Sequence, residues 1–535
     1  MMTSTIQTLL LLLAIGVAVA IVAQRLKLAP SILLVVAGVV LAVVPGIPAV
    51  ELAPEFVLLV ILPPLIYSAG VSMSWREFRF NLRPIAMLAF GCVIFTTCAV
   101  AGAVHWLLGW QWGTAFVLGA IVAPPDVVAP LAIARRLGMP RRILVVLEGE
   151  GLANDATALI LYRFAVAAVA TGVFSVSQAA GTFALIVVGE LAWGIGVGWL
   201  ALRLRHWVHN TRVEITLSLM TPYVAYWVPE HFGGSGVLAT VAAGLYVSWN
   251  GPRLISAATR LQGIFFWDLV IYLIESFVFL LTGLQARTLI EKAQAFPLRD
   301  ILLATAITTA IVIVARFIWM FPGIYGPRWI SPALRKRDPS PPWQWAFALA
   351  FTGVRGVVSL AAALAIPLAT ASGAGFPQRD LILFVTFGVI IVTLVGQGLM
   401  LPSVIRWLGL GREGKAEQRR EHEAELAARS EAIQAAYQHL ERIAAERNLS
   451  AETRAFLNSR HDHRIRQVPA DLDEGLAHTR ENNDLRMELI AAERDFLYEL
   501  LRQGKITDEA RRRLERELDL EEATILSKRE VETPL

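Results

Sequence analysis

Cysteine is nearly absent from this chain, which contains two, Cys92 and Cys98. Both lie in one apolar segment, so the sequence offers neither a disulfide framework nor a cysteine metal site. A glycine-rich phosphate-binding loop and a nucleophilic catalytic triad are also missing from the sequence. We therefore expect no cofactor, no metal centre and no catalytic residues. An enzyme is not indicated, and ATP-driven mechanisms have no support.

Charged residues are scarce in the first 411 residues, where 26 Lys and Arg and 16 Asp and Glu give a net charge of +10. Hydrophobic residues make up 56% of the whole chain, and apolar runs of about 20 residues recur. This pattern predicts an all-α polytopic membrane protein. From Arg412 on the chain carries 22 Lys and Arg and 28 Asp and Glu, in a composition that favours helices. We expect a transmembrane domain over 1–411 and a helical cytoplasmic tail over 412–535.

The apolar runs predict about thirteen transmembrane helices. The first run has no Lys or Arg before it and is expected to be an uncleaved span rather than a signal peptide. Six alternate loops contain 18 Lys and Arg, and the other six contain 4, which are Arg287, Lys292, Arg299 and Arg379. This bias predicts an outside N-terminus and a cytoplasmic tail in the plasma (inner) membrane. The partner implied by the basic loops is the lipid bilayer, not nucleic acid.

Two apolar segments are interrupted by helix-breaking residues. In the first, Ala123-Pro-Pro-Asp126, the prolines free backbone carbonyls, so those of Ala123 and Pro124 are candidate ion ligands. The second, Phe351-Thr-Gly-Val-Arg-Gly356, has two glycines around Arg355. These segments are expected to cross the bilayer in opposite directions. Two broken helices related in this way are typical of inverted-repeat transporters, whose substrate site lies where the breaks meet.

A second carboxylate, Asp155, follows Asn154 within another apolar segment. A carboxylate at bilayer depth usually belongs to an ion or proton path. At about 1.5 Å per residue, Asp126 lies roughly 18 Å deep and Asp155 at a similar depth, near the middle of a core about 30 Å thick. The two aspartates and Asn154 are therefore predicted to form a site for a small cation and for protons.

Four more charged residues fall within apolar segments, namely Glu190, Glu275, Arg316 and Arg355. Because an unpaired charge at such depth is strongly destabilising, acids and arginines are expected to pair. We predict a supporting charge network of Arg316, Arg355, Glu150 and Glu275. For Glu190 a structural and a functional role are equally supported. The neighbouring Gly194-Ile-Gly-Val-Gly198 is typical of close helix packing.

The chain resembles bacterial Na⁺/H⁺ antiporters of the monovalent cation:proton antiporter 1 family over residues 5–410. Glu150-Gly-Leu-Ala-Asn-Asp-Ala-Thr157 is similar to the family's Glu-Ser-Leu-Leu-Asn-Asp signature. Asp126 matches the aspartate of the unwound fifth span. Later elements match in order and spacing, and these are Glu275, Arg316 and Gly353-Val-Arg-Gly356.

Three positions depart from the family pattern. Ser68 stands where an acid is common, Gly151 stands where a serine is common, and Pro125 precedes Asp126. With fewer side-chain oxygens near Asp155, the choice between Na⁺, K⁺ and Li⁺ stays open, with Na⁺ expected first.

The resemblance implies a homodimer that exchanges cations for protons by alternating access and contributes to pH homeostasis. Its core would move against a dimerisation scaffold. Exchange is expected to be electroneutral, because Asp155 is the titrating carboxyl and Asp126 stays ionised near Arg355. One alternative is a cation channel or sensor with a signalling tail. A membrane enzyme such as a Mg²⁺-dependent prenyltransferase is a weaker one, because both aspartates lie at mid-depth and the cytoplasmic loops are basic.

Overall fold

The computed structural model describes residues 2–45, 52–172, 175–208, 210–293, 296–370, 373–448, 450–466 and 472–532. Within these ranges the chain is helical, without a β-strand, and one isolated bridge joins Ala369 to Gly375. The chain divides into two compact units, Met1–Leu410 and Gly411–Leu535. The roles expected for the two parts of the chain stay predictions.

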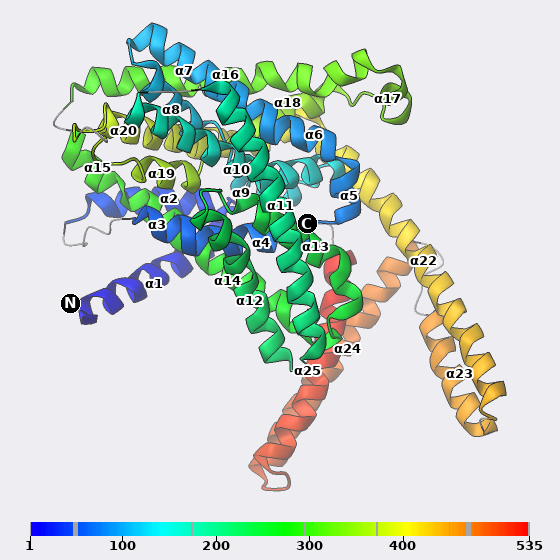
Figure 1. Ribbon diagram of the computed structural model, residues 1–535. Helices are drawn as coiled ribbons and strands as arrows, with labels where there is room; N and C mark the ends of the chain where they lie inside the picture. Colours follow the sequence, from blue (N-terminus) through cyan, green and yellow to red (C-terminus); the bar gives the residue numbers. More distant parts are fainter. Residues whose placement is uncertain are drawn as a thin grey trace. The chain divides into compact units, whose positions relative to one another are not determined.

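The first unit is a bundle of helices (Figure 1). Its helices are α1 (Met2–Leu26), α2 (Pro30–Val43), α3 (Pro54–Phe56), α4 (Leu62–Ser72), α5 (Trp75–Phe80), α6 (Leu82–Ala86), α7 (Val93–Leu108), α8 (Trp112–Val122), α9 (Val128–Arg136), α10 (Arg141–Thr171), α11 (Val176–Trp207), α12 (Thr211–His231), α13 (Val237–Leu254), α14 (Ala257–Leu284), α15 (Ala286–Ala293), α16 (Leu298–Ile330), α17 (Pro332–Arg337), α18 (Trp343–Phe351), α19 (Val357–Leu364), α20 (Arg379–Ile391) and α21 (Gly398–Leu408). Short π-helical stretches join α3 to α4, α6 to α7, and α20 to α21.

Seven helices in the described part of the chain are long and apolar enough to cross a membrane. They are Pro54–Ser72, Leu82–Leu108, Arg141–Thr171, Val176–Trp207, Ala257–Lys292, Leu298–Ile330 and Arg379–Leu408. Three apolar helices are shorter, namely Leu10–Leu26, Pro30–Val43 and Trp112–Val122. The prediction of an all-α polytopic membrane protein is confirmed. The total of thirteen spans stays a prediction, because a half-helix beside a break is too short to be recognised by length.

Both predicted helix breaks are present. A non-helical stretch over 123–127 separates α8 from α9, and it contains Pro124 and Pro125. A proline has no backbone N–H to donate to the preceding turn, so the regular hydrogen-bond pattern ends there. Residues 352–356, which include two glycines, separate α18 from α19 in the same way. The breaks therefore put backbone groups that have no partner within their own helix into the interior of the bundle.

Glycines let two pairs of helices approach closely. A Cβ on Gly194 of α11 would overlap the carbonyl oxygen of Ala239 on α13. A Cβ on Gly38 of α2 would lie 2.8 Å from the Cα of Gly283 on α14. Backbones this close gain dispersion contacts that larger residues would prevent. The close packing predicted for this segment is therefore confirmed at Gly194 and at Gly198, where a Cβ would lie 3.0 Å from the carbonyl oxygen of Ala243, but not at Gly196, where nothing lies within 4 Å.

Replacing Gly194 by alanine is expected to destabilise the bundle by roughly 1–3 kcal/mol, because the added methyl group must push α11 away from α13. Gly189→Ala on the same helix is the matched control, since nothing lies within 4 Å of a Cβ built there. Thermal unfolding of the two purified variants in one detergent checks this difference. Equal melting temperatures would contradict the close approach.

Glu190 stabilises the start of α13. Its Oε1 accepts hydrogen bonds from the backbone N–H groups of Ser235 and Gly236 at 2.6 and 3.1 Å. Its Oε2 accepts one from the N–H of Leu238 at 3.1 Å. The first N–H groups of a helix have no partner within the helix, and a negative charge is favourable there. These contacts give Glu190 a structural role.

The second unit consists of α22 (Leu410–Glu446), α23 (Ala451–Arg466), α24 (Leu472–Arg502) and α25 (Asp508–Glu532). Ser450 and Thr507 cap α23 and α25, accepting hydrogen bonds from N–H groups three residues on, each at 3.2 Å. A small apolar core contains Ile490 of α24 with Leu518 and Ile525 of α25. These contacts make α24 and α25 an antiparallel pair in which each helix covers the apolar stripe of the other.

Candidate functional site

The two helix breaks meet and are joined by hydrogen bonds. The backbone N–H of Asp126 donates to the carbonyl oxygen of Val354 at 2.7 Å. Arg355 donates through Nε to the carbonyl of Val122 at 2.9 Å, and through Nη2 to that of Ala123 at 3.3 Å. A buried carbonyl without a donor is costly, and each break thus supplies donors or acceptors to the other.

Arg355 is buried but makes no ion pair with an acid in the described part of the chain. Its Nη1 donates to the carbonyl of Gly353, and its backbone N–H donates to Oγ1 of Thr393 at 3.0 Å. The guanidinium thus lies at the C-terminal end of α8, where a helix dipole favours a cation. The predicted balance between Arg355 and Asp126 is not made by direct contact.

The carboxylate of Asp126 lies where two helices begin. Its Oδ1 accepts a hydrogen bond from the N–H of Val128, the first residue of α9, at 3.0 Å. A Cβ built on Gly356 would overlap Oδ2, so the carboxylate also lies directly against the start of α19. Both helix N-termini favour a negative charge at this point. Glycine at 356 leaves the space that the carboxylate fills.

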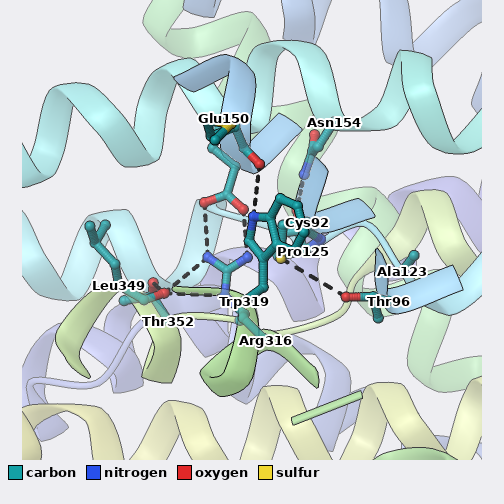
Figure 2. Close-up of polar contacts among 12 residues, drawn as sticks. Cys92, Thr96, Ala123, Pro125, Glu150, Asn154, Arg316, Trp319, Leu349 and Thr352 are labelled. Atoms are coloured by element: carbon teal, nitrogen blue, oxygen red, sulfur yellow. Dashed lines mark hydrogen bonds and ion pairs between the residues drawn. The ribbon is translucent and has the colours of Figure 1, made fainter. Parts of the chain in front are cut away.

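Asn154 is completely buried and braces the first break. Its Nδ2 donates to the carbonyl of Pro125 at 2.6 Å, and its Oδ1 accepts from the backbone N–H of Asp155 at 2.7 Å. Figure 2 shows this amide reaching toward Pro125. The contact fixes the position of Asp155 on α10 relative to the non-helical stretch that carries Asp126.

Asp155 and Asp126 line one cavity of about 390 Å³, together with Pro124, Pro125 and Glu275. The remaining wall is mostly apolar and comes from α4, α9, α10, α14, α19 and the π-helical stretch before α4. Asp155 makes no ion pair with any residue that the structure describes. Asp126, Asp155 and Glu275, none of which forms an ion pair with a described residue, give this largely apolar cavity an environment that favours occupation by a cation or by protons.

The cavity extends from the two aspartates to Ser72, Arg135 and Glu148. Glu148 forms an ion pair with Arg135, with 2.5 Å between nitrogen and oxygen, and the Arg135 side chain is exposed. These residues lie near the side of the bundle whose loops contain 18 Lys and Arg, against 4 on the opposite side. The cavity therefore gives the aspartates a path toward that side of the bundle.

Arg316 and Glu150 form a buried ion pair beside the site. The Nη1 and Nη2 atoms of Arg316 donate to the two carboxylate oxygens of Glu150 at 2.5 and 2.8 Å (Figure 2). Its Nε and Nη2 also donate to the carbonyl of Leu349, at 3.1 and 3.0 Å. The two side chains are 1% and 0% exposed. The pair ties α10, α16 and the end of α18 together.

The site residues predicted from the sequence fall into two groups. Those that line the cavity are Asp126, Asp155, Pro124 and Glu275. Those that brace the helices around it are Ala123, Glu150, Asn154, Arg316 and Arg355. Glu275 was expected in the charge network, yet it makes no ion pair with either arginine.

One ion pair near the site was missed in the sequence. Arg163, two turns beyond Asp155 on α10, donates to the carboxylate of Glu230 on α12 and to the carbonyl of Gly234 at 2.5 Å. An arginine and a glutamate inside apolar stretches were the available signal. This contact links α10, which carries Asp155, to α12 and to the loop that follows it.

Comparison with known proteins places these features in a family. The family model described as "Sodium/hydrogen exchanger, transmembrane" matches residues 9–407. The chain is 35% identical to an uncharacterised Na⁺/H⁺ exchanger of Mycobacterium tuberculosis (strain ATCC 25618 / H37Rv), over 96% of this chain and 94% of that protein. It is 31% identical to a Na⁺/H⁺ antiporter of Aphanothece halophytica, over 89% of each chain.

Two further similarities are informative. The chain is 33% identical to a sodium, potassium, lithium and rubidium/H⁺ antiporter of Bacillus subtilis, over 66% of this chain and 54% of that protein. Among solved structures, the sodium proton antiporter MjNhaP1 from Methanocaldococcus jannaschii superposes with a TM-score of 0.60 at 17% identity, covering 76% of this chain and 98% of that one. At this identity the likeness shows the fold, and it agrees with the predicted fold class.

Proposed function

Because the chain belongs to the sodium/hydrogen exchanger family, we propose that it is a secondary antiporter in which Asp155 and Asp126 bind a monovalent cation and protons in turn. The observation that carries the assignment of these residues is the cavity that both line, in which Asp155 has no ion-pair partner. A carboxylate left unpaired at this depth needs a cation or a proton to become neutral.

A hard monovalent cation prefers oxygen ligands. Asp155 and Asp126 supply two carboxylates, and the Pro124 carbonyl and water are the candidates for completing the coordination shell. The Ala123 carbonyl is a weaker candidate, because it accepts a hydrogen bond from Arg355. Glu275 on the opposite wall adds negative charge that attracts cations into the cavity.

Competition between the cation and the proton is sufficient for coupled exchange. At low pH a proton neutralises Asp155, and at high pH a cation replaces the proton at the same carboxylate. The empty site keeps both negative charges, and moving it uncompensated through the apolar interior costs several kcal/mol. Uncoupled leakage is therefore disfavoured, and each crossing of the site carries either a cation or a proton.

The cavity reaches Arg135 and Glu148, on the side that the loop charges assign to the cytoplasm. We therefore propose that this is an inward-open state of a protein with an outside N-terminus and a cytoplasmic tail. A homodimer in the plasma (inner) membrane is proposed from the resemblance of its motifs to the antiporter family.

Na⁺ is the proposed first substrate, with K⁺ and Li⁺ as alternatives, since the relative in Bacillus subtilis is named as an antiporter of several monovalent cations. The test is pH-driven uptake into proteoliposomes containing the purified chain, with each cation supplied separately. Uptake of a cation in exchange for protons supports the proposal. Cation flux that does not depend on a proton gradient would favour a channel instead.

Exchange is expected to be electroneutral, because one titrating carboxyl, Asp155, exchanges one proton for one monovalent cation. Asp126 is expected to stay ionised, since it accepts the N–H of Val128 and lies at two helix N-termini. Clamping the vesicle potential with K⁺ and valinomycin, with Na⁺ as substrate, checks this. A rate or end point that shifts with voltage would show that a second proton is carried.

A further inference from the structure

A second cavity, of about 270 Å³, lies among α4, α11, α12, α13 and α14. It is separate from the aspartate cavity, although Ser68 and Ser72 of α4 line both. Its most unusual lining residue is Arg205, in the last turn of α11. The proposed cation and proton exchange makes no use of this cavity.

Arg205 is a buried cation without a counter-ion in the described part of the chain. The residue is 4% exposed, and none of its nitrogens lies within 4.0 Å of a described acid. Its Nη2 donates to the hydroxyl oxygen of Tyr67 at 3.3 Å, while its Nε has no hydrogen-bond acceptor. Burying a charge in this way costs several kcal/mol unless an anion compensates it. An anion in the cavity would supply the missing partner.

The surroundings of Arg205 also favour an anion. α14 starts at the cavity with Thr259 and Arg260 in its lining, and the first turn of a helix favours negative charge. The hydroxyls of Ser68 and Ser72 are further donors in the wall. Asp268 is the acid in the lining, so the charged side chains of the cavity have a net charge of +1.

The remaining wall identifies the class of anion. It includes the apolar side chains of Val71, Ile215, Val247 and Ile264, and Ile264 is 63% exposed on the outer surface of the bundle. That surface faces lipid in a membrane protein. A cationic base with apolar walls fits a phosphate group that carries hydrocarbon chains. A free phosphate could bind to the same cationic base but would leave the apolar walls without a partner.

We propose that this cavity binds a phosphate group through the guanidinium of Arg205, most simply the headgroup of an anionic phospholipid. The phosphate accepts hydrogen bonds from the guanidinium of Arg205, and the acyl chains follow the apolar wall past Ile264. Bound in this way, the lipid supplies the counter-ion that no described residue provides to Arg205.

Thermal unfolding of the purified full chain in a zwitterionic detergent tests the proposal, with dioleoyl-phosphatidylglycerol, dioleoyl-phosphatidylcholine or inorganic phosphate added. Phosphatidylglycerol should raise the melting temperature in a saturable way, and phosphatidylcholine should not. Stabilisation by inorganic phosphate at the same site would identify a free anion as the ligand. Absence of stabilisation by both anions would overturn the proposal.

Arg205→Gln should weaken the apparent affinity for the anion by about tenfold or more, whereas Arg203→Gln, an exposed neighbour on the same helix, should change it little. Without any anion, Arg205→Gln should melt no lower than the wild type, because an uncompensated charge has been removed. Equal loss of affinity in both variants would show non-specific attraction to the basic surface.

Asp268→Asn keeps the proposal testable if Arg205→Gln fails to fold. This variant removes the one acid from the lining and leaves Arg205 in place, so it should bind phosphatidylglycerol more tightly. If it instead lowers the melting temperature and abolishes binding, Asp268 is the counter-ion of Arg205 and the cavity is not an anion site.

Discussion

Replacing Asp155 by asparagine is expected to abolish cation/proton exchange while leaving the fold intact. The asparagine has nearly the same shape but takes up neither a proton nor a cation's charge. Because Asp155 has no ion-pair partner among the described residues, its loss leaves no buried charge unpaired. Flux in proteoliposomes and the melting temperature in detergent are the two measurements, and transport should fall to background at an unchanged melting temperature.

Glu148→Gln is the control for this result. Glu148 lines the same cavity but is paired with Arg135 near the exposed end, so its loss should slow ion entry rather than stop exchange. Substantial exchange in Asp155→Asn vesicles would refute the role given to this carboxyl.

Asp126→Asn is expected to weaken cation affinity sharply, because half of the charge at the aspartate pair is lost.

Arg316→Ala is expected to lower the free energy of unfolding by roughly 3–5 kcal/mol and to impair transport. The substitution leaves the Glu150 carboxylate buried without a partner, and it also removes the donors to the carbonyl of Leu349. The melting temperature in detergent should fall by many degrees. A melting temperature close to the wild type would show that the pair is not needed for folding.

Arg316→Met combined with Glu150→Leu separates the cost of an unpaired charge from the value of the pair. Replacing both partners by apolar residues of similar size avoids a buried charge, so the double variant should be more stable than Arg316→Ala. Its transport should still be impaired if the pair positions the helices around the site. Recovery of stability without recovery of flux would therefore support a positioning role for the pair.

The sequence was informative where composition alone marks a position. Carboxylates in apolar segments stand out, so Asp126 and Asp155 could be chosen as candidate site residues without a structure, and both line one cavity. Proline pairs predict helix breaks because they remove backbone donors, and the first break falls where the prolines are. Gly194 indicated close packing because a residue without a side chain lets the backbone of another helix approach, and it lies against Ala239 of α13.

The sequence placed Arg316 and Glu150 in one charge network, but it could not show which members pair, because it gives depth in the membrane and not the rotation of each helix. The pair that forms joins residues 166 positions apart. Glu275 was assigned to the same network, and its position on the cavity wall depends on how α14 is turned. The hydrogen bond from Arg355 to the Ala123 carbonyl depends in the same way on the crossing of the two breaks.

The hydrogen bonds around the breaks have a mechanical consequence. Those from Asp126 to Val354, from Arg355 to Val122 and from Asn154 to Pro125 join α8, α10 and the second broken helix into one stiff body. The facing wall of the cavity, on α4 and α14, is mostly apolar. Relative displacement should therefore occur along this wall, where one set of dispersion contacts replaces another at little cost.

The Arg163–Glu230 pair crosses from α10 to α12 and would have to separate in such a displacement. Both side chains are partly exposed, so water can solvate the separated charges and the barrier stays low. The proposed ion ligands Asp126 and Asp155, by contrast, should keep their mutual geometry throughout, because the hydrogen bonds at the breaks hold both in the stiff body. A transporter with this distribution of stiffness can turn over rapidly without loosening the proposed ion site.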